Sequence, residues 1–370
     1  MVPVGDPMTT RDLVRDRLIN QQLARPTFTS AGELVSWFGA VQAQEYASAL
    51  WAVARRLRKA TAQTVEDALA DRRIIRTWPM RGTLHFVSAA DARWMLALLT
   101  PRVVGNAADY YRRRGLDEAM FARCRKLLIK ALRGGTALTR PAIYGLLEAG
   151  GVSTGDGRGL HLLGAAAQAG LICFGPRQGK QQTFVLLEEW LPAAAPLSRE
   201  EAIAEVTKRY FTSHGPATLR DLMWWSGLTV ADAKSGVEAV ASALQSEKID
   251  GETYWFRPPP RRPRLTSPCI DLLPVYDEYL VGYRDRTAVL DPASPDWLTG
   301  TNGIFSPVIV LDGRVIGTWT RTLVRDTAVV KPRLARTLAK PEREVLQAAA
   351  ERYAACFGLS ARVAWPSTSR

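Results

Sequence analysis

Two glutamines, Gln42 and Gln44, are the residues whose type and spacing most readily suggest chemistry. They lie in the segment VQAQEY, between two strongly apolar helical segments at 34–40 and 47–57. A carboxamide oxygen can accept a hydrogen bond from water, and its dipole can face a developing positive charge, although a carboxamide is a poor base. Taken alone, the pair fits a plainer interpretation better, in which both side chains cap or solvate a junction between helices.

Motifs of most other enzyme classes are missing. The sequence has no GxxxxGK[ST] loop, no GxGxxG after a strand, no HExxH and no GxSxG. Its three histidines, His85, His161 and His214, are far apart, so neither a metal site nor a cofactor is predicted. Adjacent carboxylates at 188–189 and 277–278 are expected to be solvated or capping residues, because neighbours in sequence usually point apart.

The composition is that of a globular protein with a basic surplus. Of 370 residues, 47% are hydrophobic and 23% charged, and the formal net charge is +13. An arginine-rich surplus suits phosphate, although a general preference for arginine would also explain it, and charge alone does not separate nucleic acid from an acidic membrane. No apolar run approaches the roughly 18 residues of a membrane span, and the charged segment 6–17 is unlike a secretory signal. We therefore expect a cytoplasmic protein whose four separated cysteines are reduced.

An approximate repeat organises the chain, which is long enough for two or three domains. Each copy runs helix, turn, helix, then two strands around a polar turn, which is the order of a winged helix. The third copy is clearest, since Ser198 and Glu201 form a capping box at the start of its first helix. Its helices are predicted at 198–211, 218–225 and 230–244, and its strands at 248–250 and 253–256.

The remaining segments are assigned in the same way. The second copy has helices at 117–133, 139–149 and 158–169 and strands at 171–174 and 183–187, around the basic turn 175–180. The first has helices at about 9–21, 30–40 and 63–72 and strands at 74–77 and 83–87, around the turn 78–82. A stiff, proline-rich linker at 257–264 precedes strands at 270–273, 307–311 and 315–319 and a helix at 341–357.

The predicted fold class is therefore mainly α with small β. It has three tandem winged-helix units, at 8–100, 101–195 and 196–260, and a C-terminal β-barrel-like element with a terminal helix at 261–370. The first unit carries the glutamine pair.

Several separated segments resemble one known family. In order they are VQAQEYASALWAVARR, RTWPMRGTLHFVSAADARWML, LLPVYDEYLVGYRDR and IFSPVIVLDGRVIGTWTR. They are similar to the winged-helix DNA glycosylases of the AlkZ/YcaQ type, from about residue 11 to 365. The resemblance implies three concatenated winged helices that form a basic, concave surface for duplex DNA. It also implies that the family's catalytic Gln-x-Gln motif falls on Gln42 and Gln44, in the branch associated with self-resistance to DNA-alkylating natural products, including interstrand crosslinks.

A glutamine pair would suffice for one particular substrate class. Alkylation at N7 of guanine makes the base cationic, so that it leaves as a neutral group and needs no general acid. The remaining tasks are to place water and to stabilise an oxocarbenium-like sugar, and two carboxamides can do both. Weak or no activity is expected on uracil. A monofunctional enzyme is expected too, because a lyase needs an amine and the lysine nearest in sequence to the pair is Lys59.

The remaining site predictions concern DNA contacts and support. A crosslinked base is too bulky to flip into a snug pocket, so an open groove with both glutamines exposed is expected. Residues predicted to contact DNA, each with an alternative role as an ordinary surface charge or strand residue, are Arg81, His85, Arg177, Lys180, Gln181, Arg284 and Arg286. Supporting roles are predicted for Asp277 and Tyr279, which could as well hold the β-rich element against the scaffold. Trp224 and Trp225 are expected in the core.

The predicted function is base excision from duplex DNA containing alkylated guanine or adenine, by a monomer that does not bind membranes. A non-catalytic winged-helix transcription regulator explains the charge and the repeated units equally well. Regulators, however, commonly use one winged helix per protomer with a dimer or ligand module. A DNA-binding scaffold with a degenerate site is the third alternative, and the presence of both glutamines weighs against it.

Overall fold

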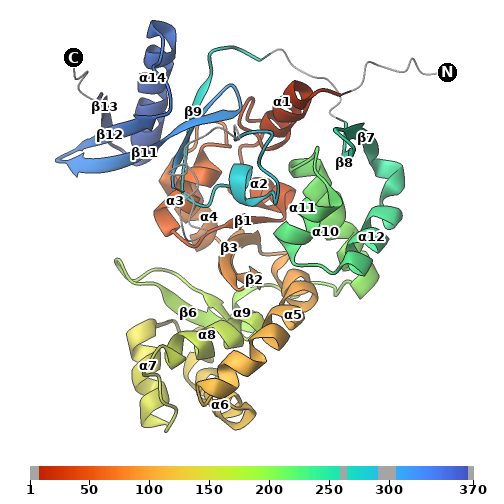
Figure 1. The fold of residues 1–370 in the computed structure, drawn as a ribbon. Helices are drawn as coiled ribbons and strands as arrows, with labels where there is room; N and C mark the ends of the chain where they lie inside the picture. Colours follow the sequence, from red (N-terminus) through yellow and green to blue (C-terminus); the bar gives the residue numbers. More distant parts are fainter. Residues whose placement is uncertain (1–7, 259–264, 291–305, 366–370) are drawn as a thin grey trace.

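The computed structural model describes residues 8–258, 265–290 and 306–365. Three helix-rich regions follow one another along the chain, and a C-terminal sheet with its own helix completes the structure (Figure 1). The N-terminal region lies centrally and contacts the other parts, so residues carried by it are well placed to form a shared site.

The N-terminal region surrounds a three-stranded antiparallel sheet ordered β1-β3-β2. The turn between β2 and β3 is shorter than predicted, because β2 continues to Met80 and leaves only Arg81 and Gly82. Both have positive φ, 54° and 72°, as a tight two-residue hairpin turn requires. The elements are α1 (Thr10–Asn20), α2 (Ala31–Phe38), β1 (Ala40–Gln42), α3 (Tyr46–Ala54), α4 (Ala62–Ala70), β2 (Ile74–Met80) and β3 (Thr83–Ser88).

A long helix that the sequence pattern did not predict, α5 (Ala92–Arg113), leads into the second region. Pro101 in its middle lacks a backbone donor, which in a sequence suggests that a helix stops there. Packing keeps the segment helical past Pro101, because α5 contacts β2 and α10. In addition, Thr100 Oγ1 donates to the carbonyls of Leu96 and Gln168 at 2.8 Å each. Tertiary contacts therefore outweigh the local preference.

The second and third regions contain the helices and hairpins in the predicted order. In the second, β6 pairs with both β4 and β5. In the third, the capping box of Ser198 and Glu201 is confirmed, and α12 ends at Ala239, earlier than predicted. The elements are α6 (Glu118–Leu132), β4 (Leu138–Thr139), α7 (Arg140–Ala149), α8 (Arg158–Gln168), β5 (Ile172–Phe174), β6 (Thr183–Leu186), α9 (Leu187–Trp190), α10 (Arg199–Ser213), α11 (Leu219–Ser226), α12 (Val230–Ala239), the 3-10 turn η1 (Ala241–Ala243), β7 (Gln245–Ile249) and β8 (Glu252–Phe256). The assignment of these regions to winged-helix units stays a prediction.

The C-terminal part is a curled sheet, which agrees with the expected β-barrel-like element in its curvature, but the sheet is open. Its order is β13-β12-β11-β10-β9, and within the described ranges β13 and β9 do not pair to close it. β12 and β13 were not predicted, and most of the predicted linker at 257–264 lies outside the described residues. The elements are β9 (Ile270–Leu273), α13 (Glu278–Val281), β10 (Val308–Leu311), β11 (Arg314–Val324), β12 (Thr327–Leu334), α14 (Lys340–Cys356) and β13 (Ser360–Val363).

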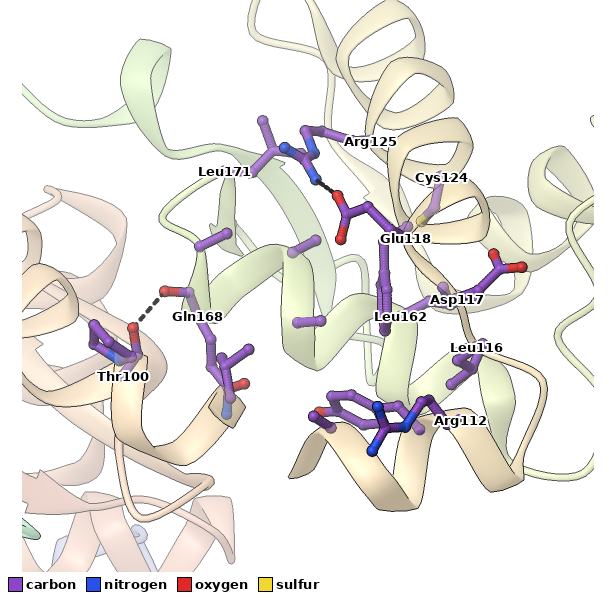
Figure 2. A pocket seen from close by; sticks show the side chains of 18 residues that line it. Thr100, Arg112, Leu116, Asp117, Glu118, Cys124, Arg125, Leu162, Gln168 and Leu171 are labelled. Carbon is purple, nitrogen blue, oxygen red and sulfur yellow. Dashed lines mark hydrogen bonds and ion pairs between the residues drawn. The ribbon is translucent and has the colours of Figure 1, made fainter. Parts of the chain in front are cut away.

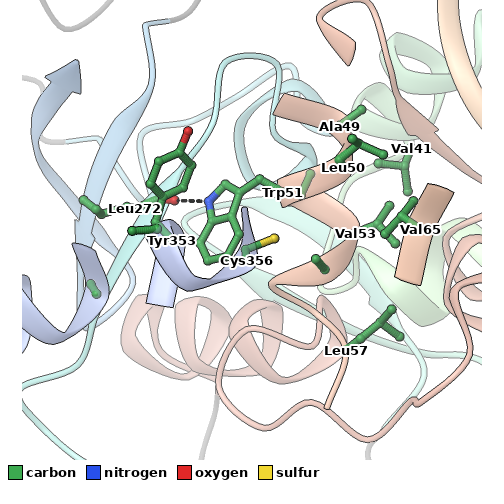
Figure 3. Close-up of a cluster of buried hydrophobic side chains, with 14 of the residues drawn as sticks. Val41, Ala49, Leu50, Trp51, Val53, Leu57, Val65, Leu272, Tyr353 and Cys356 are labelled. Carbon is green, nitrogen blue, oxygen red and sulfur yellow. Dashed lines mark hydrogen bonds between the residues drawn. The ribbon is translucent and has the colours of Figure 1, made fainter. Parts of the chain in front are cut away.

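One hydrophobic core joins the C-terminal sheet to the N-terminal region (Figure 3). Trp51 of α3 donates its indole N–H to the Leu272 carbonyl at 2.7 Å. Its ring meets that of Tyr353 edge-on, with centroids 5.3 Å apart. Trp319 of β11 donates in the same way to the Leu273 carbonyl at 2.9 Å. Because β9 is fixed by both indoles, the segment that follows it, including α13, is held against the N-terminal region.

Candidate active site

The two glutamines lie at the end of β1, which pairs with β3. In this register Gln42 is opposite His85. Side chains alternate along a strand, so Val41 enters the core with Ala43, Gln42 takes the opposite side, and Gln44 follows β1 in a bend. Both carboxamides nevertheless contact the β2–β3 hairpin, Gln42 at Arg81 and Gln44 at Leu84.

The two carboxamides differ in exposure. Gln44 is exposed, whereas Gln42 is only 9% exposed, so the expectation that both would be exposed is wrong for Gln42. The reason is the hairpin turn next to it, because Arg81 Nη2 lies 3.5 Å from Gln42 Oε1. Gln44 Oε1 accepts a hydrogen bond from the Leu84 backbone N–H at 3.1 Å.

These contacts decide which way each amide faces. A flipped amide would turn an NH₂ group towards the donor Arg81 at Gln42, or towards the donor N–H of Leu84 at Gln44, so the oxygen must face the donor in both. Within the described residues, neither Nε2 has a hydrogen-bond partner. Each glutamine thus has a fixed oxygen with a second lone pair and an NH₂ group that remains available.

The backbone of the motif is fixed from both sides. Arg76 donates from Nε to the Ala43 carbonyl at 3.0 Å and from Nη2 to the Gln44 carbonyl at 3.3 Å. Glu45 caps α3, its carboxylate accepting from the N–H groups of Ala47 and Ser48. The capping role that was the plain alternative for the glutamines therefore belongs to Glu45.

Arg81 and His85 were predicted to contact DNA, and the structure places both beneath Gln42 instead. The Arg81 guanidinium turns inward and donates to the Trp225 carbonyl as well as towards Gln42. His85 is completely buried, with Nδ1 3.0 Å from the Thr83 carbonyl and Nε2 3.4 Å from Arg81. Burial lowers the pKa of His85 to about 3, so the ring is neutral. The two side chains form the floor of the site: a DNA contact of the fully buried His85 is ruled out, whereas Arg81 is only partly buried and its DNA contact stays a prediction.

Glu278 is the functional candidate that sequence reasoning missed. It was expected to be a solvated or capping residue, yet it is 1% exposed and its Oε1 accepts the Gln42 backbone N–H at 2.8 Å. Its Oε2 accepts from the Trp225 indole at 3.0 Å and faces His214 Nε2 at 3.3 Å. The Gln42 contact spans 236 positions of the chain, so no local pattern could have indicated it.

Asp277 and Tyr279, predicted as supporting residues, flank Glu278 and anchor α13. Asp277 accepts two hydrogen bonds from Arg56, at 2.8 and 2.6 Å, and its Oδ1 caps α13. Tyr279 is buried and donates its hydroxyl hydrogen to the Gly313 carbonyl at 2.7 Å. Both side chains therefore join α13 to its surroundings, and neither contacts the glutamines.

The hairpin of β5 and β6 places the predicted DNA-contact residues Arg177, Lys180 and Gln181 at the surface. All three are exposed. Arg177 pairs with Glu66 at 3.2 Å and lies over the ring of Tyr46, 5.0 Å from its centroid. Because Tyr46 begins α3 directly after the glutamine motif, this basic hairpin lies beside the site.

The other predicted contacts, Arg284 and Arg286, follow α13. Arg284 is exposed, whereas Arg286 is partly buried and donates from Nε to the Leu280 carbonyl at 2.8 Å. Trp224, expected in the core, is 47% exposed with Arg286 over its ring, and the expected core position is correct only for Trp225. Together, Arg284, Arg286 and Trp224 place positive charge and one exposed aromatic ring beside α11 and α13.

A mainly apolar cavity lies away from the glutamines. A cavity of about 610 Å³ lies between α5, α6 and α8 (Figure 2), and neither glutamine lines it. Among the residues described, no group of three or more His, Cys, Asp and Glu side chains could hold a metal ion. Across the same ranges, no helix has the length and apolar character needed to span a bilayer.

Comparison with known proteins identifies the class. A family model described as "DNA glycosylase AlkZ-like" matches residues 35–356. The chain belongs to this family and is therefore a DNA glycosylase. A curated relative from Streptomyces sahachiroi, named interstrand DNA cross-link repair glycosylase, is 28% identical over 336 residues, 85% of this chain and 88% of the relative. The solved structure of the Streptomyces sahachiroi DNA glycosylase AlkZ has a TM-score of 0.78 at 24% identity, covering 97% of this chain and all of that chain, which shows a shared fold.

Proposed function

We propose that this chain is a monofunctional glycosylase that hydrolyses the N-glycosidic bond of N7-alkylated purines in duplex DNA, without metal or cofactor. Gln42 and Gln44 are the catalytic pair. The observation that carries the proposal is that both carboxamide oxygens are held in defined directions by the β2–β3 hairpin, each with a lone pair left for water. Preorganised dipoles of this kind act on charge that develops in a transition state.

The reaction needs little from the protein beyond placement. Water attacks C1′ of the deoxyribose while the C1′–N9 bond breaks, and the electron pair of that bond neutralises the cationic purine. The attacking water donates a hydrogen bond to a glutamine oxygen and finally releases its proton to solvent, because a carboxamide does not take it up. Holding the water close to C1′ contributes to the acceleration by removing the cost of bringing the reactants together.

The proposed substrates include bulky adducts and interstrand crosslinks formed by an alkylating natural product, in a self-resistance role. Gln44 is exposed at the end of β1, so the reacting sugar can approach without the base entering an enclosed pocket. The name of the Streptomyces sahachiroi relative, an interstrand cross-link repair glycosylase, supports the same class of substrate.

We further propose that the three helical regions are tandem winged helices that form a concave, basic DNA-binding surface in a cytoplasmic monomer. The exposed hairpin residues Arg177, Lys180 and Gln181 are its phosphate contacts beside the site, and Arg284 and Arg286 extend it beyond α13. A transcription regulator without catalysis is not favoured, because the family to which the chain belongs is one of DNA glycosylases.

The test is single-turnover base excision from a duplex that carries one N7-methylguanine, followed by mass measurement of the released base. Replacing Gln42 and Gln44 together with Ala should lower the rate by at least about 100-fold. Affinity for the duplex should stay within about 3-fold, since phosphate contacts supply most of it. Gln63→Ala, an exposed glutamine on α4, is the matched control and should excise at the parent rate. Excision by the double variant at the parent rate would remove the proposed active site.

A further inference from the structure

The Glu278 carboxylate is the point where separate parts of the chain meet below the glutamines. The Gln42 N–H comes from β1, the Trp225 indole N–H from α11, and His214 from the end of α10. All of these groups face one side chain that is 1% exposed. A buried charge with this many directed partners holds its neighbours in one arrangement.

The surrounding contacts leave Glu278 little freedom. The helix that it begins is capped by Asp277, which Arg56 holds with two hydrogen bonds. Four residues on, Gly282 packs so tightly that an added Cβ would lie 2.7 Å from His214 Cδ2. Its carbonyl also accepts the Tyr210 hydroxyl hydrogen at 2.8 Å. Movement of the carboxylate would therefore require movement of α10 or α13.

The floor of the site contains one negative and one positive charge. Burial opposes ionisation of Glu278, but the hydrogen bond with His214 outweighs it, and the charge of Arg81 adds only a smaller contribution, so that the pKa falls to about 2. Burial lowers the pKa of both His85 and His214, so these rings are neutral near pH 7. Arg81 remains a cation, because guanidinium does not lose its proton at that pH.

We propose that Glu278 is a positioning residue for base excision, which fixes the backbone of Gln42 and balances the charge of Arg81 below the reacting sugar. This inference rests on the proposed function. Excision passes through a sugar with positive charge, attached to a base that is already cationic. An unbalanced Arg81 would repel both, whereas the ionised carboxylate cancels that repulsion where water is excluded.

Glu278→Gln tests the charge at nearly constant volume. Its NH₂ group must face one of the surrounding donors, and the negative charge is lost. The excision rate from the N7-methylguanine duplex should fall about 10- to 100-fold, with affinity for the duplex within about 3-fold. Asp91→Asn is the matched control. Asp91 is also buried and accepts a tryptophan N–H, from Trp94, but it pairs with Arg209 instead of facing Gln42. The Asp91→Asn variant should have a lower melting temperature than the parent and an excision rate within about 3-fold of the parent rate.

A second variant separates charge balance from folding. Arg81→Met in the Glu278→Gln background removes the unbalanced cation, so the double variant should lose less activity than the product of the two single losses. Fully multiplicative losses would contradict the balancing role. A folded Glu278→Gln protein with the parent rate, or a rate loss that merely follows melting temperature as in Asp91→Asn, would overturn the proposal.

Hydrogen exchange supplies a readout that does not depend on activity. In Glu278→Ala, amide protection of the segment 40–46 should decrease, because the Gln42 N–H loses its acceptor. Unchanged protection there would contradict the anchoring role whatever the enzyme assay shows. If the parent protein releases no alkylated base, or the double glutamine variant stays active, the proposed function fails, while the exchange result still decides whether Glu278 anchors Gln42.

Discussion

Arg56 holds both carboxylate oxygens of Asp277 across 221 positions of the chain, and both residues are 2% exposed. The pair ties the segment after α3 to the start of α13, so it connects the strand carrying the glutamines with the helix carrying Glu278. When two buried charges are paired in this way, removing one leaves the other buried without a counter-ion, which strongly destabilises the fold.

Asp277→Ala should therefore destabilise the protein by about 3–5 kcal/mol, because Arg56 is left buried without its counter-ion. Urea unfolding followed by circular dichroism measures the change. The matched control is Glu118→Ala, which breaks an exposed pair with Arg125 and should not move the unfolding midpoint. A midpoint for Asp277→Ala equal to that of the control would show that the buried pair contributes nothing.

Stability should fall as the pH is lowered from 7.5 to 5. The pKa of His85 is about 3 in the folded protein, against 6.5 for an ordinary histidine. Between these values the unfolded chain binds a proton that the folded chain does not, so acid favours unfolding. For one such histidine the loss at pH 5 is about 2 kcal/mol.

Urea unfolding at several pH values tests this window. His85→Asn should have a smaller pH dependence than the parent between pH 7.5 and 5. Glu278 does not interfere, because its carboxylate has a pKa of about 2 and its stabilising contribution is lost only as the pH falls below about 4.5. The same pH dependence in His85→Asn and parent would mean that the pKa of His85 is not lowered in the folded protein.

The basic hairpin between β5 and β6 should strengthen DNA binding through its charge, without a preference for particular bases. Lys180→Ala is expected to weaken binding of undamaged duplex several-fold, regardless of sequence. It should also reduce the slope of log affinity against log salt by about 0.9. Fluorescence anisotropy across a salt series gives both numbers. Lys126→Ala, exposed on α6 outside the hairpin, is the control, and an equal loss of slope there would mean that the hairpin makes no specific contact.

Local sequence patterns were sufficient to predict most helices and strands of the fold. The capping box at Ser198 and the strand at 270–273 lie where the sequence predicted them. α5 was missed because Pro101 has a local effect that packing against β2 and α10 overrides. The C-terminal sheet is curled, as the β-barrel-like expectation implies, but whether its edges close was not predictable, because closure depends on pairing between distant strands and alternation within a strand carries no information about it.

For the candidate site, too, local features could be predicted from the sequence and tertiary contacts could not. The sequence identifies Gln42 and Gln44 by residue type and spacing, and the structure places Gln42 in β1 and Gln44 in the bend that follows it. The contacts that fix them do not follow from spacing. Arg81 turns inward because the Trp225 carbonyl accepts from it, and Glu278 lies beneath Gln42 because β9 and α13 dock on the N-terminal region. Both outcomes depend on tertiary arrangement.

The charge of the leaving base should decide which lesions are released. A neutral base such as uracil leaves as an anion unless an acid stabilises it, and general acids typically contribute 10²- to 10⁴-fold. The carboxyl and imidazole groups next to the glutamines are poorly suited to that role. Glu45 caps α3, Glu278 is held ionised by its partners, and His85 is buried and neutral.

The protein should therefore release N7-methylguanine at least about 1000-fold faster than uracil from otherwise identical duplexes. The rate for N7-methylguanine should also change little between pH 6 and 8, because neither Glu278 nor His85 changes its protonation state in that interval. Mass spectrometry of the released bases under single-turnover conditions measures both. Uracil release at a comparable rate would require a proton donor at the site, and water held by two carboxamides would then be an insufficient mechanism.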